Sequence, residues 1–201
     1  MTCARAQAIL RAILKKNAMT RMRIALRLGL LCCLLSVGIA DAAAAARTQP
    51  KPGDIPPDAL GRDRAGNDLT VSQHKGKVVI MTFWASWCGP CRRELPVLGY
   101  LQKTIGRDYL EVVAINYKEP KRDFQSVIRG NKDVVLTYVH DARSKISDAY
   151  GVQALPNMFI INQDGKVAHV HSGYSVDMLE GFIQEMLALL PPEARLRPAG
   201  R

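Results

Sequence analysis

The sequence VVIMTFWASWCGPC at residues 78–91 decides the fold, because it joins a strand-like run to a pair of cysteines. Residues 78–84 are almost all apolar, which is typical of a strand covered on both faces. Pro90, between Cys88 and Cys91, favours a helix that begins at the pair. At a helix start, unpaired N–H groups and the helix dipole favour the thiolate form of the first cysteine. The stretch therefore predicts a strand, a turn and a helix that presents a dithiol.

The close cysteine pair has two chemical interpretations, thiol–disulfide exchange and zinc binding. In exchange, a thiolate attacks a disulfide and the second cysteine resolves the mixed disulfide. Zinc needs two further ligands, and no histidine forms a metal-spaced pair with the cysteines; the four are His74, His140, His169 and His171. The last two share one face of a predicted strand, where we expect them to be surface residues. Redox chemistry is the favoured interpretation, and no metal or other cofactor is expected beyond a redox-active Cys88–Cys91 disulfide.

Alternating strand and helix patterns follow the pair. Strands are predicted at residues 110–116, 134–139, 157–162 and 166–171, and helices at 90–105, 119–129, 144–150 and 175–190. Ser175 is the predicted N-cap of the last helix, and short strands are predicted on either side of a turn at Gly66 and Asn67. We therefore expect an α/β fold with a central mixed, mostly parallel sheet, helices on both faces and an N-terminal extension of short strands.

The two ends of the chain differ from this alternating pattern. Arginines precede an uncharged run at residues 28–40, which is shorter than the roughly 20 residues of a membrane span, and small residues follow it. The pattern predicts that residues 1–42 are a secretory signal peptide or a retained membrane anchor. Residues 43–53 are the predicted linker, 54–190 the folded domain and 191–201 a disordered tail.

Removal of the leader changes the charge and cysteine content. The chain has 28 Lys and Arg, 18 Asp and Glu and a net charge of +10; residues 1–42 hold seven of the former and one of the latter, which leaves +4. Only Cys88 and Cys91 remain of five cysteines, unlike a scaffold held together by several disulfides. No basic helix or basic stripe with interleaved aromatics is present, so nucleic acid is not an expected partner.

Three segments resemble the TlpA/ResA-like branch of the thioredoxin superfamily, whose members are exported thiol–disulfide oxidoreductases. They are GKVV at residues 76–79, FWASWCGPCRRELP at 83–96 and VQALPNMFIINQDG at 152–165. The resemblance covers residues 52–190 and implies a thioredoxin fold for the domain at 54–190.

The resemblance also implies the roles of individual residues. Cys88 resembles the attacking thiolate and Cys91 the more buried resolving thiol. Pro156 resembles a cis-proline packed against the disulfide, and a cis bond would turn the Leu155 backbone toward the cysteines for pairing with a substrate strand. The substrate-binding surface is expected to include Leu155 and Pro156, together with Trp87, Gly89 and Pro90.

Glu94 is the third expected catalytic residue. It lies three residues after Cys91 on the same helix face, and the matching glutamate of the family tunes proton transfer at the cysteines. A nearby carboxylate raises the pKa of a thiol and accepts its proton. Cytosolic thioredoxins carry a buried Asp in the preceding strand where this chain has Thr82, which favours Glu94 as the assisting carboxylate. The alternative is a solvated helix residue.

We expect an extracytoplasmic protein, for example in the periplasm, that reduces disulfides of specific partner proteins. Expected partners are client proteins with disulfides or paired cysteines, such as those of cytochrome c maturation or copper-site assembly, and a membrane electron donor. The membrane itself is a partner only through an uncleaved leader. A peroxiredoxin is one alternative, although Ala85 stands where those enzymes need a threonine. The other is copper delivery, although proteins known for it space their cysteines by three residues.

Overall fold

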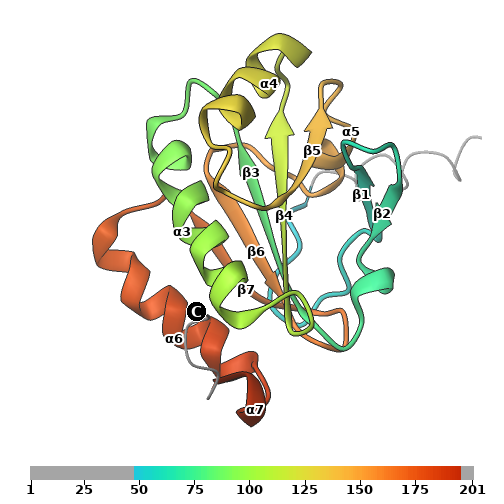
Figure 1. Ribbon diagram of the computed structural model, residues 1–201. Helices are drawn as coiled ribbons and strands as arrows, with labels where there is room; N and C mark the ends of the chain where they lie inside the picture. Colours follow the sequence, from blue (N-terminus) through green and yellow to red (C-terminus); the bar gives the residue numbers. More distant parts are fainter. Residues whose placement is uncertain (1–47, 196–201) are drawn as a thin grey trace, which may run out of the picture. The chain divides into compact units, whose positions relative to one another are not determined.

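The computed structural model describes residues 48–195 (Figure 1). The chain divides into two units after residue 45, and the described residues all belong to the second. Predictions for the leader, for residues 43–47 and for residues 196–201 lie outside the described part. Between residues 48 and 195, none of the helices has the length and apolar character needed to cross a bilayer.

The elements alternate as the sequence pattern predicts. In chain order they are β1 (Ala59–Arg62), β2 (Asp68–Thr70), η2 (Ser72–His74), β3 (Val78–Trp84), α3 (Gly89–Ile105), β4 (Leu110–Tyr117), α4 (Lys121–Gly130), β5 (Thr137–Asp141), α5 (Lys145–Ala149), β6 (Asn157–Ile161), β7 (Val167–Ser172), η3 (Val176–Met178), α6 (Leu179–Leu189) and α7 (Pro192–Arg195).

A mixed sheet of five strands has the order β5-β4-β3-β6-β7, and β1 and β2 form a separate antiparallel pair. β3 is parallel to β4, and β4 is parallel to β5, whereas β6 is antiparallel to both β3 and β7. The structure therefore confirms the thioredoxin-like mixed sheet and the N-terminal short strands. The parallel share is smaller than expected, because the chain re-enters the sheet at β6 in the direction opposite to β3.

Residues of β3 alternate between two apolar clusters, one on each face of the sheet. On one face, Ile80 and Trp84 pack with residues of α3, α4 and α6, and Figure 1 shows α3 in front of the sheet with α6 at its lower left. On the other face, Met81 and Phe83 pack with residues of β1, α5 and β6. All seven residues of β3 are buried, so the central strand needs apolar residues at nearly every position.

Two predicted boundaries differ from the observed ones, and at each a polar group has a distant partner. The helix predicted from Glu119 begins at Lys121, and the Glu119 carboxylate accepts a hydrogen bond from the Ser86 backbone at 2.7 Å. The strand predicted from residue 134 begins at Thr137, and the Val135 carbonyl before it accepts a hydrogen bond from Gln102 at 2.7 Å. In both cases the competing contact lies more than 30 residues away in the sequence.

The predicted capping role of Ser175 is wrong. Ser175 precedes the short turn η3, and α6 starts only at Leu179. Among the described residues, the Ser175 side chain makes no capping hydrogen bond. At α5 the capping group is Asp141 Oδ2, which accepts hydrogen bonds from two N–H groups of the first turn.

The predicted linker is bound to the sheet over its last residues. Gln49 Nε2 donates a hydrogen bond to Asn157 Oδ1 at 2.8 Å. The Gly53 N–H donates to the Val167 carbonyl, also at 2.8 Å. Residues 49–53 therefore lie along β6 and β7, which corrects the expectation of a linker up to residue 53.

The predicted disordered tail is helical over its first residues. Pro192–Arg195 form α7, in which Ala194 is buried. The Arg195 guanidinium donates hydrogen bonds to the carbonyls of Ala188 and Leu190, each at 2.8 Å. A cation at the last carbonyls of α6 is favoured by the helix dipole and satisfies groups that would otherwise lack partners.

Candidate active site

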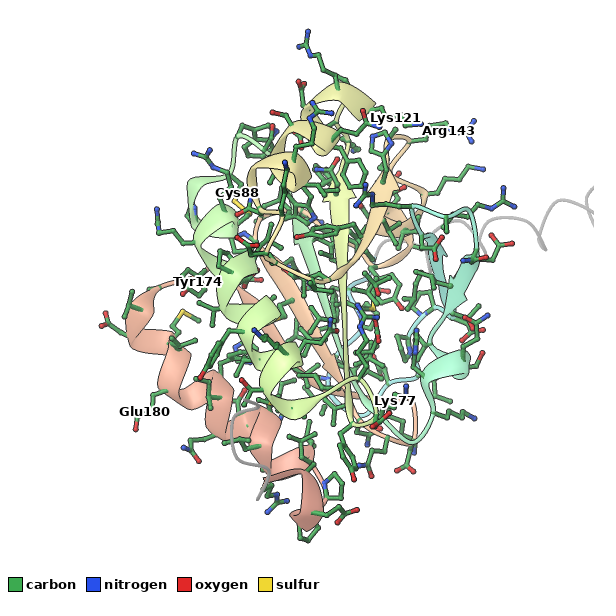
Figure 2. All side chains as sticks on the ribbon, viewed as in Figure 1. Lys77, Cys88, Lys121, Arg143, Tyr174 and Glu180 are labelled. Atoms are coloured by element: carbon green, nitrogen blue, oxygen red, sulfur yellow. A yellow bond between two sulfur atoms is a disulfide. The ribbon has the colours of Figure 1, made fainter. Side chains whose placement is uncertain are left out.

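Cys88 is the N-cap of α3 and lies where the chain leaves β3 (Figure 2). Its backbone is extended, and its Sγ accepts a hydrogen bond from the Cys91 N–H at 3.2 Å. Pro90 lies in the first turn, where a missing N–H costs no helical hydrogen bond. A disulfide joins Cys88 and Cys91, whose Cα atoms are 5.3 Å apart. The predicted strand, turn and helix that present the cysteine pair are confirmed.

The two cysteines differ in their access to solvent. Cys88 is 5% exposed, whereas Cys91 is 0% exposed. Gly89 and Pro90 are half-buried, and the preceding Trp87 is 69% exposed. The outer side of the pair therefore consists of Cys88 and the three residues that the sequence assigns to the substrate surface, while Cys91 lies beneath them.

The other tryptophan of the motif, Trp84, is a core residue. Trp84 is fully buried, and its ring centroid lies 6.1 Å from that of Phe124 and 6.2 Å from that of Tyr138. Within residues 48–195, its indole N–H has no hydrogen-bond partner. Of the two tryptophans near Cys88, only Trp87 is placed to contact another protein.

The Leu155–Pro156 peptide bond is cis, as the resemblance implies. Pro156 is buried, and Leu155 packs against the apolar cluster that contains both cysteines. Asn157, the next residue, pairs with Phe83 near the end of β3. Because β6 runs antiparallel to β3, Pro156 lies beside the carboxyl end of β3, from which the chain passes to Cys88. The strand register thus brings the proline and the cysteine pair to the same end of the sheet.

Glu94 is buried, which excludes the alternative of a solvated helix residue. It is 2% exposed, and its Oε2 accepts a hydrogen bond from Thr82 Oγ1 at 2.6 Å. Among the described residues its other oxygen, Oε1, has no partner. Burial raises the pKa of the Glu94 carboxyl to about 7, against the opposing effect of the Thr82 hydrogen bond. A carboxyl with this pKa exchanges its proton near neutral pH.

Glu119 is a buried carboxylate that the sequence analysis placed only at the start of a helix. It is 5% exposed, and it accepts hydrogen bonds from the Ser86 N–H, the Ser86 hydroxyl and Asn116 Nδ2. These contacts hold the loop between β3 and Cys88. The strand order could have indicated this contact. β3 and β4 are parallel neighbours, so the residues that follow their carboxyl ends lie at the same end of the sheet.

Three of the histidines have partners other than the cysteines. His169 and His171 are partly buried on β7, and both approach Glu185 of α6. His140 is stacked on Phe124, and its Nε2 is 2.7 Å from the Glu119 carbonyl. Over the described range, no group of three or more His, Cys, Asp or Glu side chains is arranged to hold a metal ion.

Comparison with known proteins agrees with this arrangement. A profile described as the AhpC/TSA family matches residues 52–170. The thiol-disulfide oxidoreductase ResA of Bacillus subtilis is 33% identical over 178 residues, which cover 86% of this chain and 96% of that protein.

Solved structures give the same result. A crystal structure assigned to thiol:disulfide interchange protein DsbE from Chlorobium tepidum is 32% identical with a TM-score of 0.63, covering 70% of this chain and 99% of that one. The exposed lipoprotein thioredoxin Etrx1 of Streptococcus pneumoniae is 28% identical with a TM-score of 0.55, covering 64% and 99%. The chain belongs to the AhpC/TSA family and is a thiol–disulfide oxidoreductase of the ResA/DsbE type.

Proposed function

We propose that the protein acts outside the cytoplasm and reduces disulfides in specific client proteins. The observation that carries the proposal is the placement of a buried carboxyl with a pKa of about 7, Glu94, one helical turn after the buried Cys91. A reductase must deprotonate its resolving thiol, and an acid–base group with a pKa near the working pH is suited to this task.

The proposed cycle starts from the dithiol. The Cys88 thiolate, favoured by its position at the start of α3, attacks one sulfur of a client disulfide and releases the other as a thiol. The Cys91 sulfur, after Glu94 has accepted its proton, attacks Cys88 and releases the second client thiol. The client gains two electrons and two protons, and the protein is left with the Cys88–Cys91 disulfide.

A client protein is proposed to bind at the surface that includes Trp87 and Leu155. Within residues 48–195, neither the N–H nor the C=O of Leu155 has a backbone partner, so an extended client segment can pair with both. Trp87 offers an exposed aromatic surface beside Cys88. Proteins with paired cysteines, including apocytochromes c and copper-site proteins, have the required chemistry.

The leader and one relative support the proposed location. Residues 1–42 have the pattern of a secretory signal or an anchor, and one similar solved protein is described as an exposed lipoprotein thioredoxin. A reductant outside the cytoplasm needs a source of electrons, so we include a membrane protein that reduces the Cys88–Cys91 disulfide.

The decisive experiment is trapping of clients with Cys91→Ser in the cell of origin. This variant keeps the nucleophile but has no resolving thiol, so mixed disulfides through Cys88 accumulate and can be isolated under non-reducing conditions. Cys88→Ser is the matched control and should trap nothing. Full insulin-reducing activity in Cys91→Ser, or equal trapping by both variants, would overturn the proposed cycle.

A further inference from the structure

A small pocket lies beside Glu94, between α3, β7 and the start of α6. Its lining includes the side chains of Glu94, His171 and Tyr174, and its apolar wall includes Met158 and Phe182. Its volume of about 20 Å³ is sufficient for one water molecule. The pocket thus has room for a water beside Glu94, whose Oε1 lacks a partner among the described residues.

Strand register explains why a histidine shares this pocket. Thr82 of β3 pairs with Met158 of β6, and Met158 pairs with His171 of β7. Directly paired residues point to the same face of a sheet, so the three side chains form one row. Thr82 binds Glu94 at one end of the row, His171 stands at the other end, and Met158 lies between them.

The other side of His171 is bound to a carboxylate near solvent. His171 Nε2 is 2.7 Å from Glu185 Oε2, and the two side chains are 17% and 37% exposed. A carboxylate only accepts hydrogen bonds, so Nε2 carries the hydrogen and Nδ1 is the acceptor of the neutral ring. His171 thus has contact with the pocket of Glu94 and with solvent.

We propose that His171, oriented by Glu185, passes the proton of Glu94 between the pocket and solvent. The proposal rests on the proposed role of Glu94 as proton acceptor for Cys91. A water in the pocket takes the Glu94 proton and gives one of its own to His171 Nδ1. The imidazolium then releases a proton to bulk water, and Glu94 is again a carboxylate. His171 and Glu185 act through Glu94 and do not touch the sulfurs, so they are not catalytic residues.

Few other ionisable groups surround His171. His169, on the same strand, is stacked on it with ring centroids 6.4 Å apart, and its Nδ1 is 3.5 Å from the same Glu185 oxygen. From α6, the Phe182 ring meets His171 edge-on, and from β6 the paired residue is Met158. Tyr174 follows the end of β7 and lines the pocket. Of these ionisable groups, His169 does not line the pocket, so it provides a matched control.

The test compares His171→Gln with His169→Gln. The reduced protein is mixed with a small aromatic disulfide, and the rate of closure of the Cys88–Cys91 disulfide is followed by absorbance across the pH range. For His171→Gln we expect the rate near pH 7 to fall roughly tenfold, less than the 10²–10⁴-fold effect of a positioned acid or base itself. Added imidazole should restore the rate, which a loss of packing would not allow. His169→Gln should have the wild-type rate.

Variants of Glu94 separate this proposal from the proposed function. In a Glu94→Gln background, His171→Gln should have no additional effect. If Glu94→Gln alone leaves the pH profile unchanged, the role of Glu94 fails. If Glu94→Gln changes the profile but His171→Gln does not, or if imidazole fails to rescue His171→Gln, only the relay is overturned. Should His171→Gln fail to fold, Glu185→Gln tests the same route and should show a smaller loss that imidazole also restores.

Discussion

Two neighbouring residues of the central strand, Thr82 and Phe83, lie on opposite faces of the sheet and in opposite kinds of environment. Thr82 binds the buried carboxyl of Glu94 on the face that is covered by α3. Phe83 belongs to a ring cluster with Tyr150 and Phe159, whose centroids are 5.3–6.1 Å apart. The only polar atom of these three rings, the Tyr150 hydroxyl, donates a hydrogen bond to the Pro57 carbonyl.

The central strand β3 therefore has one face that contributes mainly to stability and one face that carries the ionisable group of the proposed reaction. The ring cluster contains tightly packed apolar surface, which contributes free energy of folding at every pH. The α3 face contains a buried ionisable group whose burial costs free energy once it is charged. Variants in the ring cluster should therefore change the free energy of unfolding at every pH and leave redox reactivity unchanged, whereas variants at Glu94 should change redox reactivity and make stability depend on pH.

The largest effect is expected in the ring cluster. Phe159→Ala removes a fully buried ring, and we expect a loss of about 3–5 kcal/mol in the free energy of unfolding. Urea unfolding measures it, with Phe159→Leu as a graded control of smaller effect. The rate of disulfide exchange per folded molecule should stay at the wild-type value. A marked change in that rate would show that the two faces are not separate.

Glu94→Gln should have a pH-dependent effect on stability. The folded chain keeps the Glu94 proton up to a pKa of about 7, whereas an unperturbed glutamate has a pKa of 4.5. Between these values the folded state binds more protons, so wild-type stability falls as pH rises through them and the loss remains above pH 7. Relative to wild type, Glu94→Gln should gain up to about 3 kcal/mol at pH 8 and nothing at pH 4. Unfolding titrations at the two pH values check this, and equal differences at both would contradict it.

Thr82→Val should shift the pKa of Glu94 without removing the carboxyl. The Thr82 hydroxyl stabilises the charged form of Glu94, so its loss should raise that pKa further, by about one unit. Carbon NMR of the labelled Glu94 side chain measures the pKa directly. Ser86→Ala, in the loop next to Cys88, is the control and should leave this pKa unchanged.

Trp87→Ala should have the smallest effect on stability and a selective effect on substrates. The side chain is mostly exposed, so the free energy of unfolding should change by less than about 0.5 kcal/mol. The KM for a protein client should rise, whereas the rate with a small aromatic disulfide should remain. An equal loss with both substrates would place Trp87 in the chemistry rather than in client binding.

Local patterns predicted the central strand and the cysteine helix almost to the residue. The run at 78–84 is a buried strand, and the helix begins within one residue of the predicted start at Pro90. These features depend on the spacing of apolar residues and on the position of proline, and both can be read within a short stretch of sequence. The cis state of Pro156 required the family resemblance, because proline alone favours the trans bond.

Features that depend on distant contacts could not be predicted in full. Spacing placed Glu94 on the helix face of Cys91, but its burial arises from β7 and α6, which lie more than 70 residues later. The role of Glu119 likewise depends on Ser86, 33 residues earlier. Sequence position identified Glu94 but not Glu119, and only the packed fold gave both carboxyl groups their partners and their buried environment.

The contrast between the two tryptophans gives the protein an intrinsic fluorescent reporter. Trp84 and Trp87 are the only indoles in the chain, and one is fully buried while the other is 69% exposed beside Cys88. Exposed indoles emit at longer wavelength than buried ones, so excitation at the red edge selects Trp87. Docking of an unlabelled client over the site should then appear as a blue shift and reduced quenching by iodide, while Trp84 emission stays constant as an internal standard.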